Sequence, residues 1–284
     1  MIDELAIQFL ELVPKNLLSR GVGAATRVAL PAPLQGLVNE AFAAAAGIDR
    51  HESTKTPRRY RTLNDFFTRR LEPGARPAAA EHADEAVVPV DGTLGMFGEI
   101  DAGTLLQAKG REYSVLDLLD SGAHAEKFAG GSYATFYLSP RDYHRIHSPV
   151  DGRVDEISYI PGDLFPVFPM AVDNVDELFA VNERLISLME VDGHGPVAVV
   201  KVGATCVGRI SLSFRDCQTN QSYRRRRVER LAEPVSLEHG DEIGVFNLGS
   251  TVILLFGEPG IEFAAPLEEG RNVQMGELLG RWGR

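Results

Sequence analysis

The stretch of sequence that decides the fold covers residues 243–257 and reads Ile-Gly-Val-Phe-Asn-Leu-Gly-Ser-Thr-Val-Ile-Leu-Leu-Phe-Gly. It carries no charge, and acidic residues flank it on both sides. A helix that spans a membrane needs about 18 or more apolar residues, whereas this run is shorter and contains Asn247 and Ser250. Its β-branched and aromatic residues, interrupted by Gly249 and Ser250, predict two buried strands joined by a turn.

The same texture extends toward the N-terminus as far as Ala86, with short apolar runs separated by Asp-Gly, Gly-Gly and Pro-Gly pairs. The tetrapeptide Pro-Val-Asp-Gly occurs twice, at 89–92 and 149–152, and each copy predicts a turn between strands. Helical patterns interrupt the strands at 115–119 and 176–188. These features predict a mixed or antiparallel β-rich core with barrel-sandwich character.

The first part of the chain has a helical pattern. Apolar residues recur at three- and four-residue spacing in residues 1–50, and we expect further helices at 34–46 and 63–71. Residues 73–80 read as a linker of proline, glycine and alanine. The protein is therefore expected to be α+β, with amphipathic N-terminal helices in residues 1–76 and the β-rich core in residues 77–284.

Composition narrows the functions that this chain can have. Asp and Glu outnumber Lys and Arg by 40 to 29, and the net charge of −11 argues against a nucleic-acid partner. Cys206 and Cys217 lack the spacing of a metal site and form no disulfide framework, which suggests a reducing compartment. Asp3 and Glu4 stand where a signal peptide carries positive charge, so no signal peptide is expected.

Residues 51–76 are the long basic stretch of the first half of the chain. A run of this kind is usually a solvated face, but beside apolar helices it could meet lipid phosphates. The residues of this stretch with positive charge are Lys55, Arg58, Arg59, Arg61, Arg69, Arg70 and Arg76.

Two histidines lie three positions apart, His144 and His147, within Ser-Pro-Arg-Asp-Tyr-His-Arg-Ile-His-Ser-Pro. Histidine pairs serve as metal ligands or in proton transfer. A metal site would need further ligands, and neither a His-Glu-x-x-His motif nor a cysteine pair supplies them, so no metal is expected. Proton transfer is the favoured interpretation, and two structural histidines bonded to backbone carbonyls remain the alternative.

The Gly249-Ser250 pair has two interpretations. It can be an ordinary turn between buried strands. Alternatively, a serine hydroxyl in a dry and rigid site can be a nucleophile when a base lies nearby. The preceding glycine would then allow the close approach and the strained geometry that attack on its own carbonyl requires.

At this point the sequence resembles the phosphatidylserine decarboxylase proenzymes of bacterial, membrane-associated type. Leu-Gly-Ser-Thr at 248–251 is similar to the family's self-cleavage motif, 138–147 to its histidine motif, and 89–92 to its aspartate motif. Further blocks agree at 107–110, 159–165, 179–184 and 202–205. The run Arg224-Arg225-Arg226-Arg227 has no counterpart in this resemblance and looks like a loop peculiar to this chain.

The resemblance implies two successive activities. In the first, Asp91, His147 and Ser250 act as a relay in which the Ser250 hydroxyl attacks the carbonyl of Gly249. Cleavage between Gly249 and Ser250 then leaves a β chain of residues 1–249 and an α chain of residues 250–284. The ester formed by this attack breaks by elimination, and the dehydroalanine left at position 250 hydrolyses with loss of ammonia to an N-terminal pyruvoyl group, so pyruvate bound covalently is the expected cofactor.

In the second implied activity, the pyruvoyl group forms a Schiff base with phosphatidylserine, and loss of CO2 leads to phosphatidylethanolamine. His144 is the expected proton donor. Phe165, Phe168 and Met170 are expected to line an apolar pocket for the reacting carboxylate.

The resemblance also implies partners and a location. Residues 1–76 would rest on a bilayer, which places the protein peripherally on the cytoplasmic side of the cell membrane. The two chains of one proenzyme would form a heterodimer, and two such heterodimers a dimer.

Three other functions remain possible from the residues alone. A serine hydrolase is disfavoured because Ser250 lacks a Gly-x-Ser-x-Gly elbow. A carrier module of lipoyl type would need a lysine at a hairpin tip, and neither Pro-Val-Asp-Gly copy contains one. A pyruvoyl enzyme acting on a soluble amino acid would not need the amphipathic helices.

Overall fold

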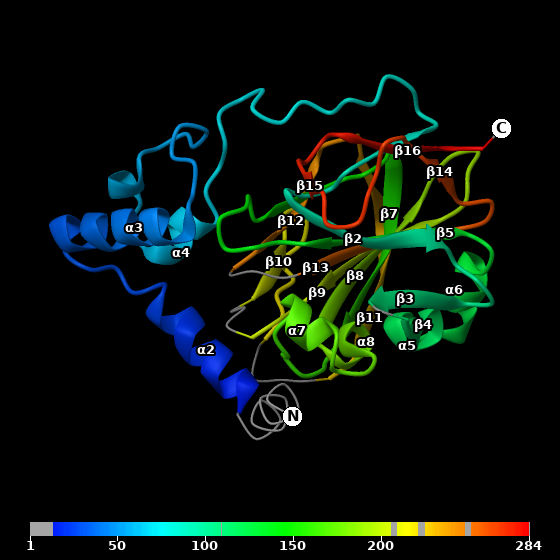
Figure 1. Cartoon of the computed structure of the whole chain (residues 1–284), viewed down its shortest axis with the longest axis horizontal. Coiled ribbons are helices and arrows are strands. Elements are labelled where there is room, and N and C mark those ends of the chain that lie inside the picture. The colour runs from blue at the N-terminus through cyan, green and yellow to red at the C-terminus, as the bar shows by residue number, and fades with distance from the viewer. Residues whose placement is uncertain (1–13, 109, 206–208, 221–224, 248–250, 284) are drawn as a thin grey trace.

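A computed structural model describes residues 14–108, 110–205, 209–220, 225–247 and 251–283 (Figure 1). The helices are α2 (Lys15–Ala25), α3 (Ala32–Ala46), the 3-10 helix η1 (Pro57–Arg59), α4 (Leu63–Phe67), α5 (Val115–Leu119), α6 (Gly122–Phe128), α7 (Pro169–Val172) and α8 (Leu178–Val181). The strands are β1 (Glu85–Val87), β2 (Gly92–Glu99), β3 (Thr104–Ala108), β4 (Arg111–Ser114), β5 (Ser132–Tyr137), β6 (Arg145–His147), β7 (Gly152–Ile160), β8 (Arg184–Glu190), β9 (Val197–Val202), β10 (Ile210–Leu212), β11 (Arg227–Leu237), β12 (Glu242–Phe246), β13 (Thr251–Phe256), β14 (Ile261–Phe263), β15 (Asn272–Val273) and β16 (Leu278–Trp282).

The core is an antiparallel sheet of eight described strands in the order β11-β7-β8-β9-β13-β5-β2-β15. Strand β13 lies inside this sheet and is buried on both faces. Val252, Leu254 and Phe256 enter one apolar cluster, and Ile253 and Leu255 enter the other. The sheet ends at β11 and β15 without closing on itself, so the α+β prediction is confirmed with an open sheet at its centre.

The two strands expected in residues 243–257 are present as β12 and β13, but they do not pair with each other. Strand β12 lies between β10 and β6 in a three-stranded sheet, whereas β13 belongs to the large sheet. The chain therefore changes sheets between Phe246 and Thr251. This crossing brings the end of β12, and with it the histidine motif on β6, to the start of β13.

Both Pro-Val-Asp-Gly copies precede a strand, and their glycines begin β2 and β7. A Cβ atom on Gly92 would lie 2.3 Å from the carbonyl oxygen of Tyr137, so only glycine allows β5 to approach this closely. The tetrapeptide thus sets the start of two long strands in the large sheet.

The helix predictions are partly confirmed. Helix α5 has the expected bounds, and α4 begins at Leu63 as expected but ends at Phe67. The prediction of a helix over 176–188 is wrong, because only Leu178–Val181 is helical and Arg184–Glu190 forms strand β8. The β8 residues pair with β7 and β9 and are buried on both faces, so tertiary pairing decides their structure.

Helices α2, α3 and α4 stand beside the sheet core, with the N-terminal end of α2 near the bottom of the view (Figure 1). The leucines of α2 and α3 face outward, since Leu17, Leu18, Leu34 and Leu37 are exposed, whereas the phenylalanines of α4 are buried. The buried positions of α2 and α3 hold mainly small or polar residues. None of the described helices is both long and apolar enough to cross a membrane. The predicted pattern over residues 1–13 lies outside the described residues.

Candidate active site

Backbone hydrogen bonds bring the three predicted motifs together. The His147 amide donates to the Pro89 carbonyl at 2.9 Å, which joins the histidine and aspartate motifs. The Phe246 amide donates to the His144 carbonyl at 3.0 Å, near the end of β12. Gly249 and Ser250 themselves lie outside the described residues. Phe246 and Thr251, which flank them, lie where the three motifs come together.

Thr251 enters the same arrangement from the large sheet. It pairs with Tyr137 of β5, and Tyr137 pairs on its other side with Thr93 of β2. Thr93 lies two residues after Asp91. Thr251 is the second residue of the predicted cleavage motif Gly-Ser-Thr after the bond. It therefore lies across β5 from the start of β2, the strand that begins directly after Asp91.

His147 is held so that a specific ring nitrogen can act as a base. Its Nδ1 lies 2.6 Å from the Gly240 carbonyl oxygen, which only accepts, so Nδ1 carries the proton. Its Nε2 then carries the lone pair and accepts from the Tyr143 hydroxyl at 3.2 Å. Burial lowers the pKa of His147, and the Gly240 carbonyl opposes this effect. His147 is therefore neutral at pH 7, the form that a general base needs.

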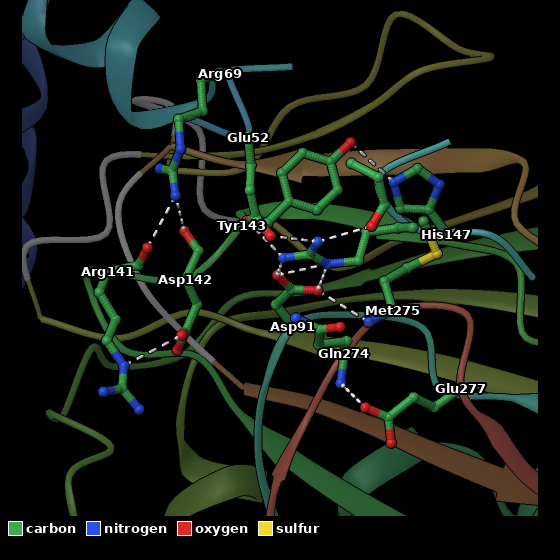
Figure 2. Close-up of polar contacts among 12 residues, drawn as sticks. Glu52, Arg69, Asp91, Arg141, Asp142, Tyr143, His147, Gln274, Met275 and Glu277 are labelled. Carbon is green, nitrogen blue, oxygen red and sulfur yellow. Dashed lines mark hydrogen bonds and ion pairs between the residues drawn. The ribbon is translucent and has the colours of Figure 1, made fainter. Parts of the chain in front are cut away.

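Asp91 is buried and bound by Arg76, a residue that the sequence analysis had placed in a linker. The Arg76 guanidinium donates to both Asp91 carboxylate oxygens at 2.8–3.1 Å and to both Glu52 oxygens at 2.8–2.9 Å. The Met275 amide, from the predicted α chain, donates to Asp91 Oδ1 at 2.9 Å. Figure 2 labels Glu52, Asp91 and Met275, the residues that these hydrogen bonds connect.

Asp91 and His147 lie close together but do not bond to each other among the described contacts (Figure 2). The negative charge of Asp91 still acts on the imidazole, because it raises the pKa of His147. The Gly240 carbonyl occupies Nδ1, the position that an aspartate takes in a hydrolase triad. Asp91 is thus placed to stabilise an imidazolium through space, and the predicted relay itself remains a prediction.

His144 is fully buried, and its ring stacks on Phe67 of α4 with 4.0 Å between centroids. Its Nε2 donates to the Ser139 carbonyl at 3.0 Å. Its Nδ1 has no hydrogen-bond partner within the described part of the chain. Burial, together with the charge of Arg69, lowers the pKa of His144 to about 3. The neutral ring can therefore accept a proton at one atom, Nδ1, which carries a free lone pair.

A cavity of about 300 Å³ opens at Thr251. Apolar side chains dominate its lining, which includes Met96, Val167, Val172 and Phe179, and Tyr137 also faces it. Thr251 is buried, and its hydroxyl is unpartnered among the described residues, so a polar group of a ligand can bond here.

The three residues expected to line such a pocket do not do so in the described structure. Phe165 belongs to the apolar core and contacts the Lys15 ammonium of α2 at 3.9 Å. Phe168 is exposed and Met170 half-buried, and neither lines the cavity at Thr251. The error is one of register along the 165–172 segment, since Val167 and Val172 are the residues that face the cavity.

The basic stretch 51–76 is only partly a solvated face. Arg69 and Arg76 are turned inward, and Arg69 Nη2 donates to the carbonyls of Arg141 and Asp142. The sequence carried one signal for this arrangement, a high density of arginine directly before the aspartate motif. Arg224 lies outside the described residues, while Arg226 pairs with Asp120 on the surface.

Comparison with known proteins shows the family of this chain. The family described as Phosphatidylserine decarboxylase matches residues 63–281. The chain is 47% identical to the phosphatidylserine decarboxylase proenzyme of Anaeromyxobacter sp. (strain K), over 99% of both chains. It is 42% identical to the proenzyme of the same name from Myxococcus xanthus, again over 99% of both chains. The corresponding Brevibacillus brevis protein is 42% identical over 94% of each chain.

The fold, the buried histidine and aspartate cluster and these relatives define the chain as an enzyme of the decarboxylase class. It belongs to the phosphatidylserine decarboxylase family, and the resemblance drawn from its motifs is confirmed.

Proposed function

We propose that this chain cleaves itself between Gly249 and Ser250 and then converts phosphatidylserine to phosphatidylethanolamine and CO2. The observation that carries the proposal is the convergence of the segments on either side of this bond. Phe246 bonds to His144, and Thr251 is level with the strand that follows Asp91. The names of the relatives, all proenzymes of phosphatidylserine decarboxylase, support the same activity.

In the cleavage step, His147 Nε2 takes the proton of the Ser250 hydroxyl. The Gly240 carbonyl holds the tautomer that makes Nε2 the basic atom. In the structure the Tyr143 hydroxyl donates a long hydrogen bond of 3.2 Å to Nε2, and the Ser250 hydroxyl would replace it as the donor. Asp91 stabilises the positive charge that develops on the imidazole, and Arg76 and Met275 keep its carboxylate in place.

The residues around Thr251 fit a pyruvoyl group at position 250. The cavity is mostly apolar, and the Thr251 hydroxyl is free to bond to a substrate group. A pyruvoyl group supplies an electron sink for the electrons left when CO2 departs. The largely apolar lining favours the loss of a carboxylate charge, and the carboxylates of Asp173 and Glu269 also line the cavity.

His144 is proposed to move a proton at its Nδ1 atom. Since its pKa is lowered to about 3, the ring holds no proton there at neutral pH. It must therefore take up a proton during turnover and pass it on within the same catalytic cycle. The fixed bond from Nε2 to Ser139 keeps the ring in the orientation that this transfer needs.

Helices α2 and α3 are proposed to bind the membrane surface peripherally, on the cytoplasmic side. Their leucines face outward, and a patch of this kind is typical of a lipid or protein contact. Aspartate at Leu34 and Leu37 should weaken sedimentation with lipid vesicles, whereas Leu106→Asp and Leu116→Asp, exposed leucines of the core, should not. Association of the processed chains into a dimer of heterodimers remains a prediction.

The activity is tested by incubating the purified protein with phosphatidylserine in detergent micelles and measuring phosphatidylethanolamine by mass spectrometry. Wild-type protein should form the product, and the full-length Ser250→Ala variant should form none. Ser236→Ala, which removes an exposed hydroxyl on β11 that does not line the cavity, is the matched control and should retain activity. Product formation by Ser250→Ala at the wild-type rate would exclude a pyruvoyl group from the mechanism.

A further inference from the structure

A second cavity, of about 350 Å³, lies between η1, α4 and the histidine motif and shares no lining residue with the cavity at Thr251. Six basic side chains line it against one carboxylate, that of Asp65. The basic residues are Lys55, Arg59, Arg61, Arg69, Arg70 and Arg145. Such an excess of positive charge around a concave surface favours an anionic ligand.

Two of the six cations share one carboxylate, and the other four have no carboxylate at ion-pair distance in the described part of the chain. Arg145 and Arg70 share the Glu242 carboxylate, at 2.8 Å and 3.2 Å. Lys55, Arg59 and Arg61 form no ion pair with any carboxylate in the described part of the chain. The positive charge of this cavity therefore comes mainly from side chains without an ion pair among the described residues, one of which, Lys55, lies 5.8 Å from the centre of the Tyr60 ring.

Arg69 is the strongest indication that the cavity is built for a ligand. Its side chain is only 4% exposed, yet Nε and Nη1 have no hydrogen-bond partner among the described residues. Nη2 alone is used, by the carbonyls of Arg141 and Asp142. A buried guanidinium with unpaired donors is costly, whereas anionic oxygens that accept from Nε and Nη1 would remove this cost.

The position of the cavity indicates the source of the anion. The segment that supplies Lys55, Arg59 and Arg61 packs on α3, where Arg58 contacts Gly36. The neighbouring α3 residues Leu34 and Leu37 are exposed. Lipid phosphates lie directly beside the hydrocarbon region of a bilayer, so a cavity next to an apolar helix face is at the level of the headgroups.

We propose that this cavity binds the phosphodiester of an anionic membrane phospholipid, with Arg69 as its buried anchor. The inference rests on the proposed membrane-directed function and adds a specific headgroup site to it. Inorganic or other soluble phosphate shares the chemistry, so the test separates the two sources.

The test measures binding of full-length protein to vesicles of phosphatidylcholine with phosphatidylglycerol, an anionic lipid that lacks the serine amine and is not decarboxylated. The variant Lys55→Gln/Arg61→Gln is chosen because both side chains are exposed and make no ion pair among the described residues. Its matched control is Lys127→Gln/Arg153→Gln, which removes the same charge from α6 and β7 of the core.

At low salt, each basic residue near an anionic surface contributes about fivefold in binding, so the cavity variant should bind about 30-fold more weakly. The control should change little, because its side chains lie on the core rather than beside the apolar helices. Equal losses in the two variants, or no loss in either, would overturn the proposal.

The second arm titrates the deacylated headgroup, glycerophosphoglycerol, by calorimetry. We expect saturable binding to one site that is lost in Lys55→Gln/Arg61→Gln, together with the loss on vesicles. Headgroup binding without any effect on vesicles would indicate a site for soluble phosphate and overturn the lipid assignment. Neither arm measures decarboxylation, so failure of this proposal is distinguishable from failure of the proposed activity.

Discussion

The two copies of Pro-Val-Asp-Gly occupy equivalent positions before a strand, yet their aspartates have different environments. Asp91 is 7% exposed, and among the described residues it accepts hydrogen bonds from Arg76 and the Met275 amide. Asp151 has a side chain that is 48% exposed and pairs with His239 at 2.6 Å. The same four residues therefore give one buried carboxylate beside His147 and one on the surface.

The second copy is nevertheless connected to the first. Asp151 also accepts from the His239 amide, and His239 Nε2 donates to the Glu85 carbonyl at 2.8 Å. The next residue, Gly240, supplies the carbonyl that fixes the tautomer of His147. The comparison teaches that one copy supplies charge to the site, whereas the other supports the loop that orients the base.

The largest effect on self-cleavage is expected from the histidines near the two aspartates, His147 near Asp91 and His239 beside Asp151. His147→Ala should slow self-cleavage by at least about 10³-fold, because the group proposed to take the serine proton is lost. His239→Ala should slow it by about tenfold or less, since it only loosens the Gly240 loop. Cleavage is followed by gel electrophoresis of proenzyme made in a cell-free reaction. Comparable rates for the two variants would contradict the assignment of His147 as the base.

The aspartates should differ in the same direction. Asp91→Asn should slow cleavage by about 10²- to 10³-fold, the usual loss when a preorganised charge is removed from a transition state. A loss as large as the roughly 10⁴-fold seen for a triad aspartate is not expected, because Gly240 and not Asp91 fixes the tautomer. Asp151→Asn should slow self-cleavage by about fivefold or less. Equal rates for the two variants would remove the distinction between the copies.

Arg76 should matter through Asp91. Arg76→Gln should slow cleavage by about 10- to 100-fold, and Arg76→Lys should restore part of the rate because charge is kept but the fork is lost. In the Asp91→Asn background, Arg76→Gln should cause little further loss. Arg153→Gln, which breaks an exposed pair with Asp192, is the control and should not change the rate. Fully additive losses from Arg76→Gln and Asp91→Asn would show that Arg76 acts elsewhere.

The smallest effect concerns stability and pH at His144. The pKa is about 3 in the folded chain and near 6.5 when unfolded, so the unfolded state binds more protons between these values. The free energy of unfolding therefore receives the full contribution of neutral His144 above pH 6.5. It falls with the pH, by about 2 kcal/mol between pH 6.5 and 5. The free energy of unfolding of Ser250→Ala should fall more steeply over this range than that of Ser250→Ala/His144→Phe. Parallel curves for the two proteins would show that His144 is not buried as a neutral ring.

The sequence predicted the motifs and the strands well because their information is local. Strand β13 is an uninterrupted apolar run, and each Asp-Gly pair ends a turn as expected. The helix expected over 176–188 failed because the pairing of β8 with β7 and β9 overrides a helical spacing of apolar residues. Periodicity within one segment does not reveal such pairing, although β9 follows β8 directly in the sequence.

The polar partners of the site could not be predicted for the same reason. Arg76 and Glu52 lie in segments that read as linker and solvated face, and only tertiary structure brings them to Asp91. Gly240 acts through its backbone carbonyl, which every residue has, so no residue type marks it. The identities of Asp91, His147 and Ser250 came from motifs, whereas their supporting contacts needed the fold.

The central claim is that the chain becomes an enzyme by cutting itself at Gly249–Ser250. The most direct test is the intact mass of the purified wild-type protein beside that of Ser250→Ala. Wild type should give two chains, residues 1–249 and 250–284, the second lighter by one ammonia than a chain with N-terminal serine. Ser250→Ala should give one chain of about 31.0 kDa. A fully active wild-type protein that remains a single uncut chain would contradict the account.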